Sequence, residues 1–352
     1  MNFFQPYSTE SDRHSHLQSR RSGVHHASPL AKVRSGRATS YGSQAQAEGK
    51  RTVASFQLSS SQTTFFREQG YLRLDRVVEP HEVEALKGLL QTLFTNGAGY
   101  SEGAQFDLVG SDDSVTQPML PQIINPSNYA RELLRTSFFK TASEIAHQLL
   151  GPHARFSDDH VLMKPAKTGA ATPWHQDEAF RDPRYETREI SIWLALQPVD
   201  RRNGCMEFIP GSNLGEVLPH RSPNGNSSVH ALECFDGFDA EAAVPCPLPA
   251  GGCTIHSGRT LHFAGPNLSD LPRYAYVLIF NLPPLPVRES RDFPWLADRQ
   301  TQHAERNRRW RSHGGFAVEA VRWVRKLDPR DFQRLLYDVR RARAAVARAF
   351  RH

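Results

Sequence analysis

The chain has 352 residues, of which 39% are hydrophobic, and a formal net charge of +6. This apolar content is enough for one large domain with a buried core and tails outside it. No apolar run approaches the roughly 18 residues that a membrane span needs, so we expect no transmembrane segment. The four cysteines form no C-x-x-C pair and do not match structural zinc spacing, which indicates reduced thiols in a cytoplasmic protein.

The first segment, residues 1–58, is rich in Ser, Arg, His, Gly and Gln and has no apolar periodicity. This composition predicts a disordered, solvated tail. An Arg- and Ser-rich, acid-poor segment also fits a mitochondrial transit peptide, and that alternative stays open. Much of the basic excess lies in the two tails, so the charge indicates no clear nucleic-acid site in the middle of the chain.

Three helices are expected before the first long strands. The run from Phe65 predicts a short helix that stops at Gly70 and continues as a strand. Pro80 fits the first turn of a helix, where its missing N–H costs nothing. The apolar residues of this helix recur at helical spacing: Val83, Leu86, Leu90 and Leu93. A second amphipathic helix is expected over about Tyr129–Leu150, ending before Gly151.

From Ala154 the pattern changes to short strands separated by Gly and Pro, which is typical of a sandwich or barrel. The expected strands are Arg155–Lys164, Glu189–Pro198, Cys205–Ile209, Cys253–Ser257 and Arg273–Leu282. In Glu189–Pro198 one face carries aliphatic residues and the other carries Trp193, so we expect this strand to be packed on both sides. These strands place one β domain at residues 59–287.

Residues 288–352 are Arg-rich and predict a helical C-terminal extension. One apolar stripe runs through Phe332, Leu335, Val339, Ala342, Val346 and Ala349. We interpret the stripe as the face of a helix that docks on the β domain, and a surface for an acidic partner or membrane stays open.

The central motif is Pro173-Trp174-His175-Gln176-Asp177-Glu178. A His and an Asp two positions apart on a strand project from the same face and can bind one cation together. A further histidine, His262, follows downstream at a strand edge. Two His and one carboxylate on one face of a metal leave open positions, the arrangement of non-haem Fe(II) oxygenases. His256 is an alternative third ligand.

An arginine follows the last of these histidines. Arg273 comes eleven residues after His262, at the start of an apolar strand. A single guanidinium among small apolar neighbours is expected to point into a cavity, where its fork matches a carboxylate in bidentate fashion.

Together these segments resemble the phytanoyl-CoA dioxygenase family. The resemblance is carried by W-H-Q-D, by N-G-C-M-E-F-I-P-G-S-N, by H-x-x-G-P-N-x-S-x-x-x-R and by F-F-R-E-Q-G-Y-L, and it spans about Thr64–Leu285. It implies a mainly β fold with flanking α-helices and a double-stranded β-helix (jelly-roll, cupin-like) core. It also implies dependence on Fe(2+), 2-oxoglutarate and O₂.

The resemblance also implies roles for single residues. His175, Asp177 and His262 match the metal ligands and catalytic centre, and Arg273 matches the residue that binds the distal carboxylate of 2-oxoglutarate. Trp193 and Gln122 match positions of the 2-oxoglutarate pocket.

The chain departs from the family at Ala264, where members often have a Ser that helps hold 2-oxoglutarate. Either Arg273 then has less help in holding 2-oxoglutarate, or a neighbour such as Ser257 or Thr254 substitutes for the Ser. Asp177 occupies the position where halogenating relatives bind halide, which favours oxidation. Glu178 is expected to face away from the metal as a solvent or substrate-channel group.

The predicted function is therefore Fe(II)- and 2-oxoglutarate-dependent hydroxylation of an aliphatic C–H in a small molecule of lipid, acyl or natural-product type. The alternatives are a non-catalytic jelly-roll binding protein with a vestigial site, and a cupin metalloenzyme that does not use 2-oxoglutarate. Substrate contacts are expected within 96–116, 180–187 and 220–243. The sequence indicates no oligomeric state.

Overall fold

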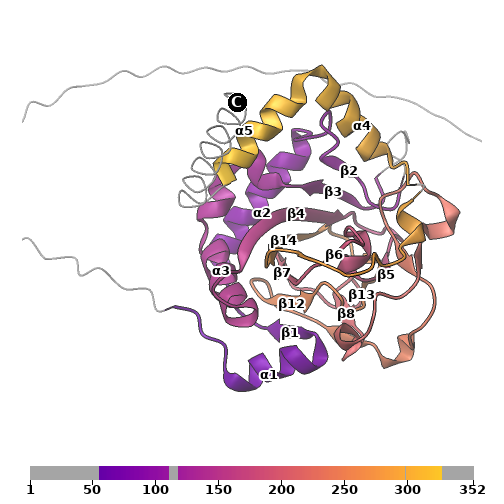
Figure 1. The fold of residues 1–352 in the computed structure, drawn as a ribbon. Coiled ribbons are helices and arrows are strands. Elements are labelled where there is room, and N and C mark those ends of the chain that lie inside the picture. Colours follow the sequence, from indigo (N-terminus) through magenta and orange to yellow (C-terminus); the bar gives the residue numbers. More distant parts are fainter. Residues whose placement is uncertain (1–54, 111–117, 298, 327–352) are drawn as a thin grey trace, which may run out of the picture. The chain divides into compact units, whose positions relative to one another are not determined.

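Two antiparallel sheets pack face to face in the computed structural model, which describes residues 55–110, 118–297 and 299–326 (Figure 1). The seven-stranded sheet has the order β1 (Tyr71–Leu74), β12 (Cys253–Ser257), β7 (Glu189–Ala195), β14 (Arg273–Asn281), β4 (Arg155–Lys164), β3 (Pro121–Ile124), β2 (Gln105–Asp107). The four-stranded sheet has the order β11 (Val244–Cys246), β8 (Met206–Phe208), β13 (His262–Ala264), β5 (Thr172–His175). This arrangement confirms the expected jelly-roll core.

The remaining elements are short strand pairs and helices around these sheets. The strand pairs are β9 (His220–Arg221) with β10 (Glu233–Cys234), and β6 (Tyr185–Glu186) with β15 (Leu285–Pro286). The α-helices are α1 (Ser60–Gln69), α2 (Pro80–Thr95), α3 (Ser137–Leu150), α4 (Gln302–Trp310) and α5 (Phe316–Lys326). The short helical turns are η1 (Pro126–Asn128), η2 (Arg131–Arg135), η3 (Asp177–Phe180), η4 (Ser212–Leu214), η5 (Pro223–Gly225), η6 (Ala240–Ala242), η7 (Pro294–Leu296) and η8 (Arg311–Gly315).

The seven-stranded sheet has a different partner on each face, as the pattern of β7 predicts. Helices α2 and α3 cover one face, and the four expected apolar residues of α2 are all buried there (Figure 1). Ile190, Ile192 and Leu194 of β7 belong to this core. Trp193 and Ala195 lie on the opposite face, in the core between the two sheets. Each face of β7 therefore packs against a separate layer.

The expected end of α1 at Gly70 is confirmed, but α1 begins at Ser60 rather than at Phe65, and the expected start of α3 is wrong. A capping box of Ser59 and Gln62 begins α1, and Gly70 ends it with a φ of 80°, a conformation that favours glycine. The helix expected from Tyr129 begins only at Ser137. Thr136 is extended and its hydroxyl accepts the N–H of Phe139, so it caps the helix and separates it from η2.

The two ends of the chain are only partly described. Residues 1–54 of the expected tail, the apolar stripe from Phe332 to Ala349 and residues 111–116 of one expected substrate segment lie outside the described residues. Among the helices that the structure does describe, none is both long and apolar enough to cross a membrane.

Candidate active site

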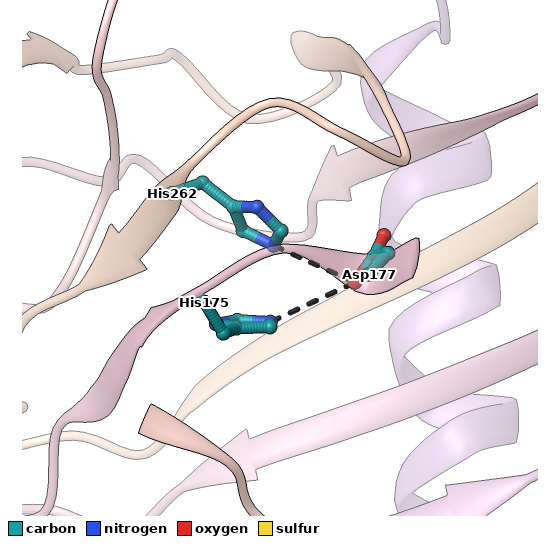
Figure 2. A group of neighbouring side chains, drawn as sticks. All are labelled: His175, Asp177 and His262. Carbon is teal, nitrogen blue, oxygen red and sulfur yellow. Dashed lines mark ion pairs between the residues drawn. The ribbon is translucent and has the colours of Figure 1, made fainter. Parts of the chain in front are cut away.

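His175, Asp177 and His262 come together at one edge of the four-stranded sheet (Figure 2). His175 is the last residue of β5 and lies opposite His262, the first residue of β13. The Nε2 atoms of His175 and His262 lie 3.6 and 3.7 Å from Oδ1 of Asp177. One ligand atom from each residue lies within 4.8 Å of the others, so the three side chains could hold a metal ion.

The carboxylate reaches this point by a different local structure from the expected one. The strand ends at His175, and Asp177 is the first residue of the turn η3. The idea that His175 and Asp177 share a strand face is therefore wrong. The turn nevertheless brings the carboxylate back toward both imidazoles.

Backbone hydrogen bonds orient both imidazoles for metal binding. Nδ1 of His175 lies 2.7 Å from the carbonyl oxygen of Pro173, and Nδ1 of His262 lies 2.8 Å from that of Thr260. An Nδ1–H that donates to a carbonyl leaves Nε2 with its lone pair facing Asp177. Burial is the main cause that lowers the pKa of both histidines, which favours the neutral, ligating form.

The carboxylate of Asp177 is hydrogen-bonded through Oδ2, the oxygen that does not face His175 and His262. Burial alone would raise the pKa of Asp177, but the neighbouring His262, His256 and His175 bring it well below its usual value. The hydroxyl of Ser191 donates to Oδ2 of Asp177 over 2.8 Å. Oδ1 is therefore the oxygen presented to the two histidines.

His256, the alternative third ligand, lies near Oδ2 of Asp177, whereas His175 and His262 lie near Oδ1. Its Nε2 is 3.3 Å from Oδ2 of Asp177, the oxygen that Ser191 also contacts. The set of mutually close ligand atoms contains His262 instead. The geometry therefore favours His262 as the second imidazole.

A cavity of about 180 Å³ is lined by the three side chains together with Arg273, Trp193 and Gln122. Its walls come from both sheets, including β14, β7 and β3 of the larger one. The six candidate residues from the sequence analysis therefore line a single cavity, although they lie on five separate strands and one turn.

Arg273 is buried in this cavity with a side chain only 2% exposed. Its Nε and Nη2 donate to the carbonyl oxygens of Asn203 and Gly204 over 3.3 and 3.2 Å, and its guanidinium lies 5.3 Å from the ring centre of Trp193. No carboxylate in the described part of the chain forms an ion pair with it. Burial without such a partner lowers the pKa of Arg273 to about 9.

Two further polar residues, Gln122 and Lys164, are buried in this part of the fold. Gln122 is 4% exposed, lines the cavity, and makes no side-chain hydrogen bond with any residue that the structure describes. Lys164 lies opposite Arg273 in the β4–β14 register and is fully buried, donating to the carbonyls of Ala170 and Ala264. Burial and the nearby Arg273 bring the pKa of Lys164 well below its usual value, so the guanidinium of Arg273 is the charge that this end of the cavity presents, and it suits an anion.

The hydroxyl beside the position of the missing Ser belongs to neither of the two residues expected there. Ala264 lines the cavity, but Ser257 and Thr254 do not. Ser257 lies 3.2 Å from the hydroxyl of Thr260 instead. Thr172 of β5 lies directly opposite Ala264 in the register and does line the cavity. It is the hydroxyl nearest in the register to the position of the missing Ser.

The expectation for Glu178 is half wrong. It does not line the cavity of the three ligating residues, but it is fully buried rather than open to solvent or a channel. Its carboxylate forms ion pairs of 2.6 Å with Arg259 and with Arg291. The chain turns into η3 after His175, and this turn aims Glu178 at the two arginines.

The other wall of the cavity contains residues that no motif indicated. Phe180, Arg181 and His230 line it, together with His160 of β4. The expected substrate segments 96–110, 180–187 and 220–243 each contribute at least one lining residue, Leu108 in the first case. Only the general location of this wall was predictable from the sequence.

Comparison with known proteins matches the same part of the chain. The family model for phytanoyl-CoA dioxygenase (PhyH) matches residues 66–275. The crystal structure of EvdO2 from Micromonospora carbonacea var. aurantiaca complexed with 2-oxoglutarate is 35% identical with a TM-score of 0.60, over 69% of this chain and 98% of that one. A probable alpha-ketoglutarate-dependent hypophosphite dioxygenase from Stutzerimonas stutzeri is 25% identical over 59% of this chain and 73% of its own. The peroxisomal phytanoyl-CoA dioxygenase of Bos taurus is 22% identical, and the match covers 65% of its length.

The jelly-roll fold, the His-Asp-His group and these relatives define a non-haem iron, 2-oxoglutarate-dependent dioxygenase, an enzyme that uses Fe(2+), 2-oxoglutarate and O₂. Within this class the resemblance seen in the sequence is confirmed. The chain belongs to the phytanoyl-CoA dioxygenase (PhyH) family. Its cytoplasmic location stays a prediction, since one relative is peroxisomal.

Proposed function

We propose that the enzyme hydroxylates an aliphatic C–H of a small molecule of lipid, acyl or natural-product type. In this proposal His175, Asp177 and His262 hold Fe(2+). Arg273 binds the distal carboxylate of 2-oxoglutarate, and Trp193 and Gln122 complete the pocket around it. Succinate and CO₂ are the products formed from 2-oxoglutarate.

The observation that carries the proposal is the state of Arg273. A buried guanidinium without a carboxylate partner is costly, unless a ligand supplies the missing charge. Arg273 keeps Nη1 and part of Nη2 for such a ligand, because its backbone contacts use Nε and Nη2. The cavity joins this cation to the three ligating side chains, so one dicarboxylate can meet both.

The residues of the chain bind and orient, and the reactive chemistry comes from the bound groups. Fe(2+), when bound, supplies with 2-oxoglutarate and O₂ the oxidising power for C–H attack. Ser191 and the carbonyls of Pro173 and Thr260 fix the three ligand side chains, which lowers the cost of ordering them. Thr172 donates a hydroxyl to the 2-oxoglutarate end of the cavity, where Ala264 replaces the usual Ser.

The carboxylate of Asp177 favours hydroxylation over halogenation, because it fills the position that a halide needs. The two alternative functions are not favoured. A vestigial site in a binding protein does not account for a complete set of three ligands whose two imidazoles are oriented by backbone carbonyls. A metalloenzyme that does not use 2-oxoglutarate leaves the charge of Arg273 unexplained.

The test is succinate formation by purified protein with Fe(2+), 2-oxoglutarate and O₂. We expect slow formation without substrate and loss of it in Asp177→Ala. Asp182→Ala is the matched control, because Asp182 is an exposed carboxylate that pairs with Arg184. Equal turnover in the wild type and Asp177→Ala would contradict the ligand assignment. A panel of acyl thioesters, fatty acids and natural-product skeletons, scored by stimulated succinate formation, then identifies the substrate class.

A further inference from the structure

A segment beyond the end of the family match, residues 285–299, contacts the turn that carries Asp177. The family model ends at residue 275. The first strand of the segment, β15, pairs with β6, which follows η3 in the chain. The N–H of Arg291 donates to the carbonyl of Pro183 over 3.2 Å, and its Nη2 donates to the carbonyl of Tyr185 over 2.6 Å. The segment therefore lies along residues 183–186, directly after η3.

Glu178 is the side chain of η3 that this segment holds. Nη1 of Arg291 donates to Oε1 of Glu178 over 2.6 Å, and Nε of Arg259 donates to Oε2 over the same distance. The side chain of Glu178 is only 1% exposed. Separation of these groups would leave a buried charge without its partner, which is costly. Because each arginine holds a different oxygen, the carboxylate is fixed in orientation as well as in position.

Two backbone groups of the same turn are held at the same time. The N–H of Glu178 donates to the carbonyl of Gly258 over 2.9 Å. The carbonyl of Ala179 accepts from Nε1 of Trp295, also over 2.9 Å. The ring of Trp295 is itself fixed, since it stacks on Phe293 at 4.8 Å. The backbone of η3 is thus held from outside the cavity.

The position of η3 decides where the ligand Asp177 lies, because Asp177 is its first residue. Asp177 lines the cavity and Glu178 does not, so neighbouring residues of the turn serve the metal site and its anchor. Ser191 contacts the side chain of Asp177 but leaves its backbone to other contacts. Partners that orient metal ligands from outside typically contribute 10–100-fold to metal affinity.

We propose that Arg291 and Trp295 are positioning residues of the metal centre. They hold the turn η3, Arg291 through Glu178 and Trp295 through the carbonyl of Ala179, and so keep the carboxylate of Asp177 in place for Fe(2+). The proposal rests on the ligand assignment of the proposed function and deepens it. It gives the C-terminal extension a part in iron binding, although none of its residues lines the cavity.

The test is the affinity of the full-length protein for Fe(2+), measured by anaerobic calorimetric titration. We expect Arg291→Met to raise the Kd about 10-fold, the lower end of the range for outer partners, because Arg259 still holds one oxygen of Glu178. Removal of a positive charge alone would favour a cation, so weaker binding indicates a change in ligand position. Arg288→Met, at an exposed arginine of the same segment, is the matched control. An unchanged Kd in Arg291→Met overturns the proposal.

Two milder substitutions apply even where Arg291→Met does not fold. Arg291→Lys keeps a cation for Glu178 and should bind Fe(2+) more tightly than Arg291→Met but less tightly than the wild type. Trp295→Phe keeps a ring to stack on Phe293 but removes the N–H that Ala179 accepts, and its Kd for Fe(2+) should also rise. Wild-type affinity in Trp295→Phe contradicts its positioning role.

A second substitution at Glu178 tests the route. If Arg291 acts through Glu178, Arg291→Met should raise the Kd for Fe(2+) by a smaller factor in the Glu178→Gln background than in the wild type. The same factor in both backgrounds contradicts this route.

Hydrogen exchange of the metal-free protein separates positioning from a loss of overall stability. In Arg291→Met we expect faster exchange of the amides of residues 176–181, with wild-type rates in β14. Exchange that rises equally in β14 contradicts the positioning role. The ligand assignment is tested separately by Asp177→Ala. Wild-type affinity for Fe(2+) in that variant refutes the assignment, whereas its loss there and an unchanged Kd in Arg291→Met overturn this proposal alone.

Discussion

Replacement of Arg273 by Leu should weaken the use of 2-oxoglutarate more than any other single change that leaves the metal ligands intact. The guanidinium is buried, and no carboxylate of the described residues neutralises it. A charge-assisted contact contributes about 1.5–3 kcal/mol. Since 1.4 kcal/mol is a factor of ten, KM for 2-oxoglutarate should rise about 12- to 150-fold.

The assay is succinate formation against 2-oxoglutarate concentration at saturating iron. Arg273→Lys should lie between the wild type and Arg273→Leu, because it keeps the charge but loses the planar fork. Arg201→Leu is the control, because Arg201 is an exposed arginine that pairs with Glu207. An unchanged KM in Arg273→Leu would refute the assignment of the distal carboxylate to this residue.

Four further outcomes are expected. His262→Ala should lose bound iron, measured by metal analysis after anaerobic loading, and iron retained at the wild-type level would favour His256 as ligand. Thr172→Val should raise KM for 2-oxoglutarate about 2- to 12-fold, the effect of one neutral hydrogen bond, and no change would remove it from the cosubstrate end. Glu178→Gln should lower the free energy of unfolding by about 3 kcal/mol in urea titrations, since it leaves two arginines without their carboxylate. The four buried cysteines, whose thiol pKa values burial raises, should resist alkylation at pH 8 until the protein is unfolded, so rapid native labelling would contradict their burial.

Residue type and spacing predicted the centre of the site because its chemistry needs a particular set of groups. His175 and His262 are far apart in sequence, yet strand pairing places them opposite each other. The alternation along its strand predicted that Trp193 lies on the face opposite the aliphatic residues, whereas its role in the 2-oxoglutarate pocket was implied by the family resemblance alone. Such features depend on local patterns that a single sequence carries.

The errors arose where local structure departs from a regular period. The expected strand stops at His175, so Glu178 turns toward Arg259 and Arg291 instead of solvent. The cavity wall that contains Phe180, Arg181 and His230 could not be predicted in detail. The contact between His230 and His303 joins residues 73 positions apart, and no motif accompanies it. Contacts of this kind depend on how the C-terminal extension packs.

The central claim is that one molecule of 2-oxoglutarate meets both the metal and Arg273. Anaerobic calorimetric titration of 2-oxoglutarate into the metal-free and the Fe(2+)-loaded protein tests it most directly. We expect tight binding at one site only when Fe(2+) is present, weaker binding in Arg273→Leu, and loss of the metal-dependent part in His262→Ala. Equal binding with and without Fe(2+), or binding that neither substitution changes, would contradict the claim.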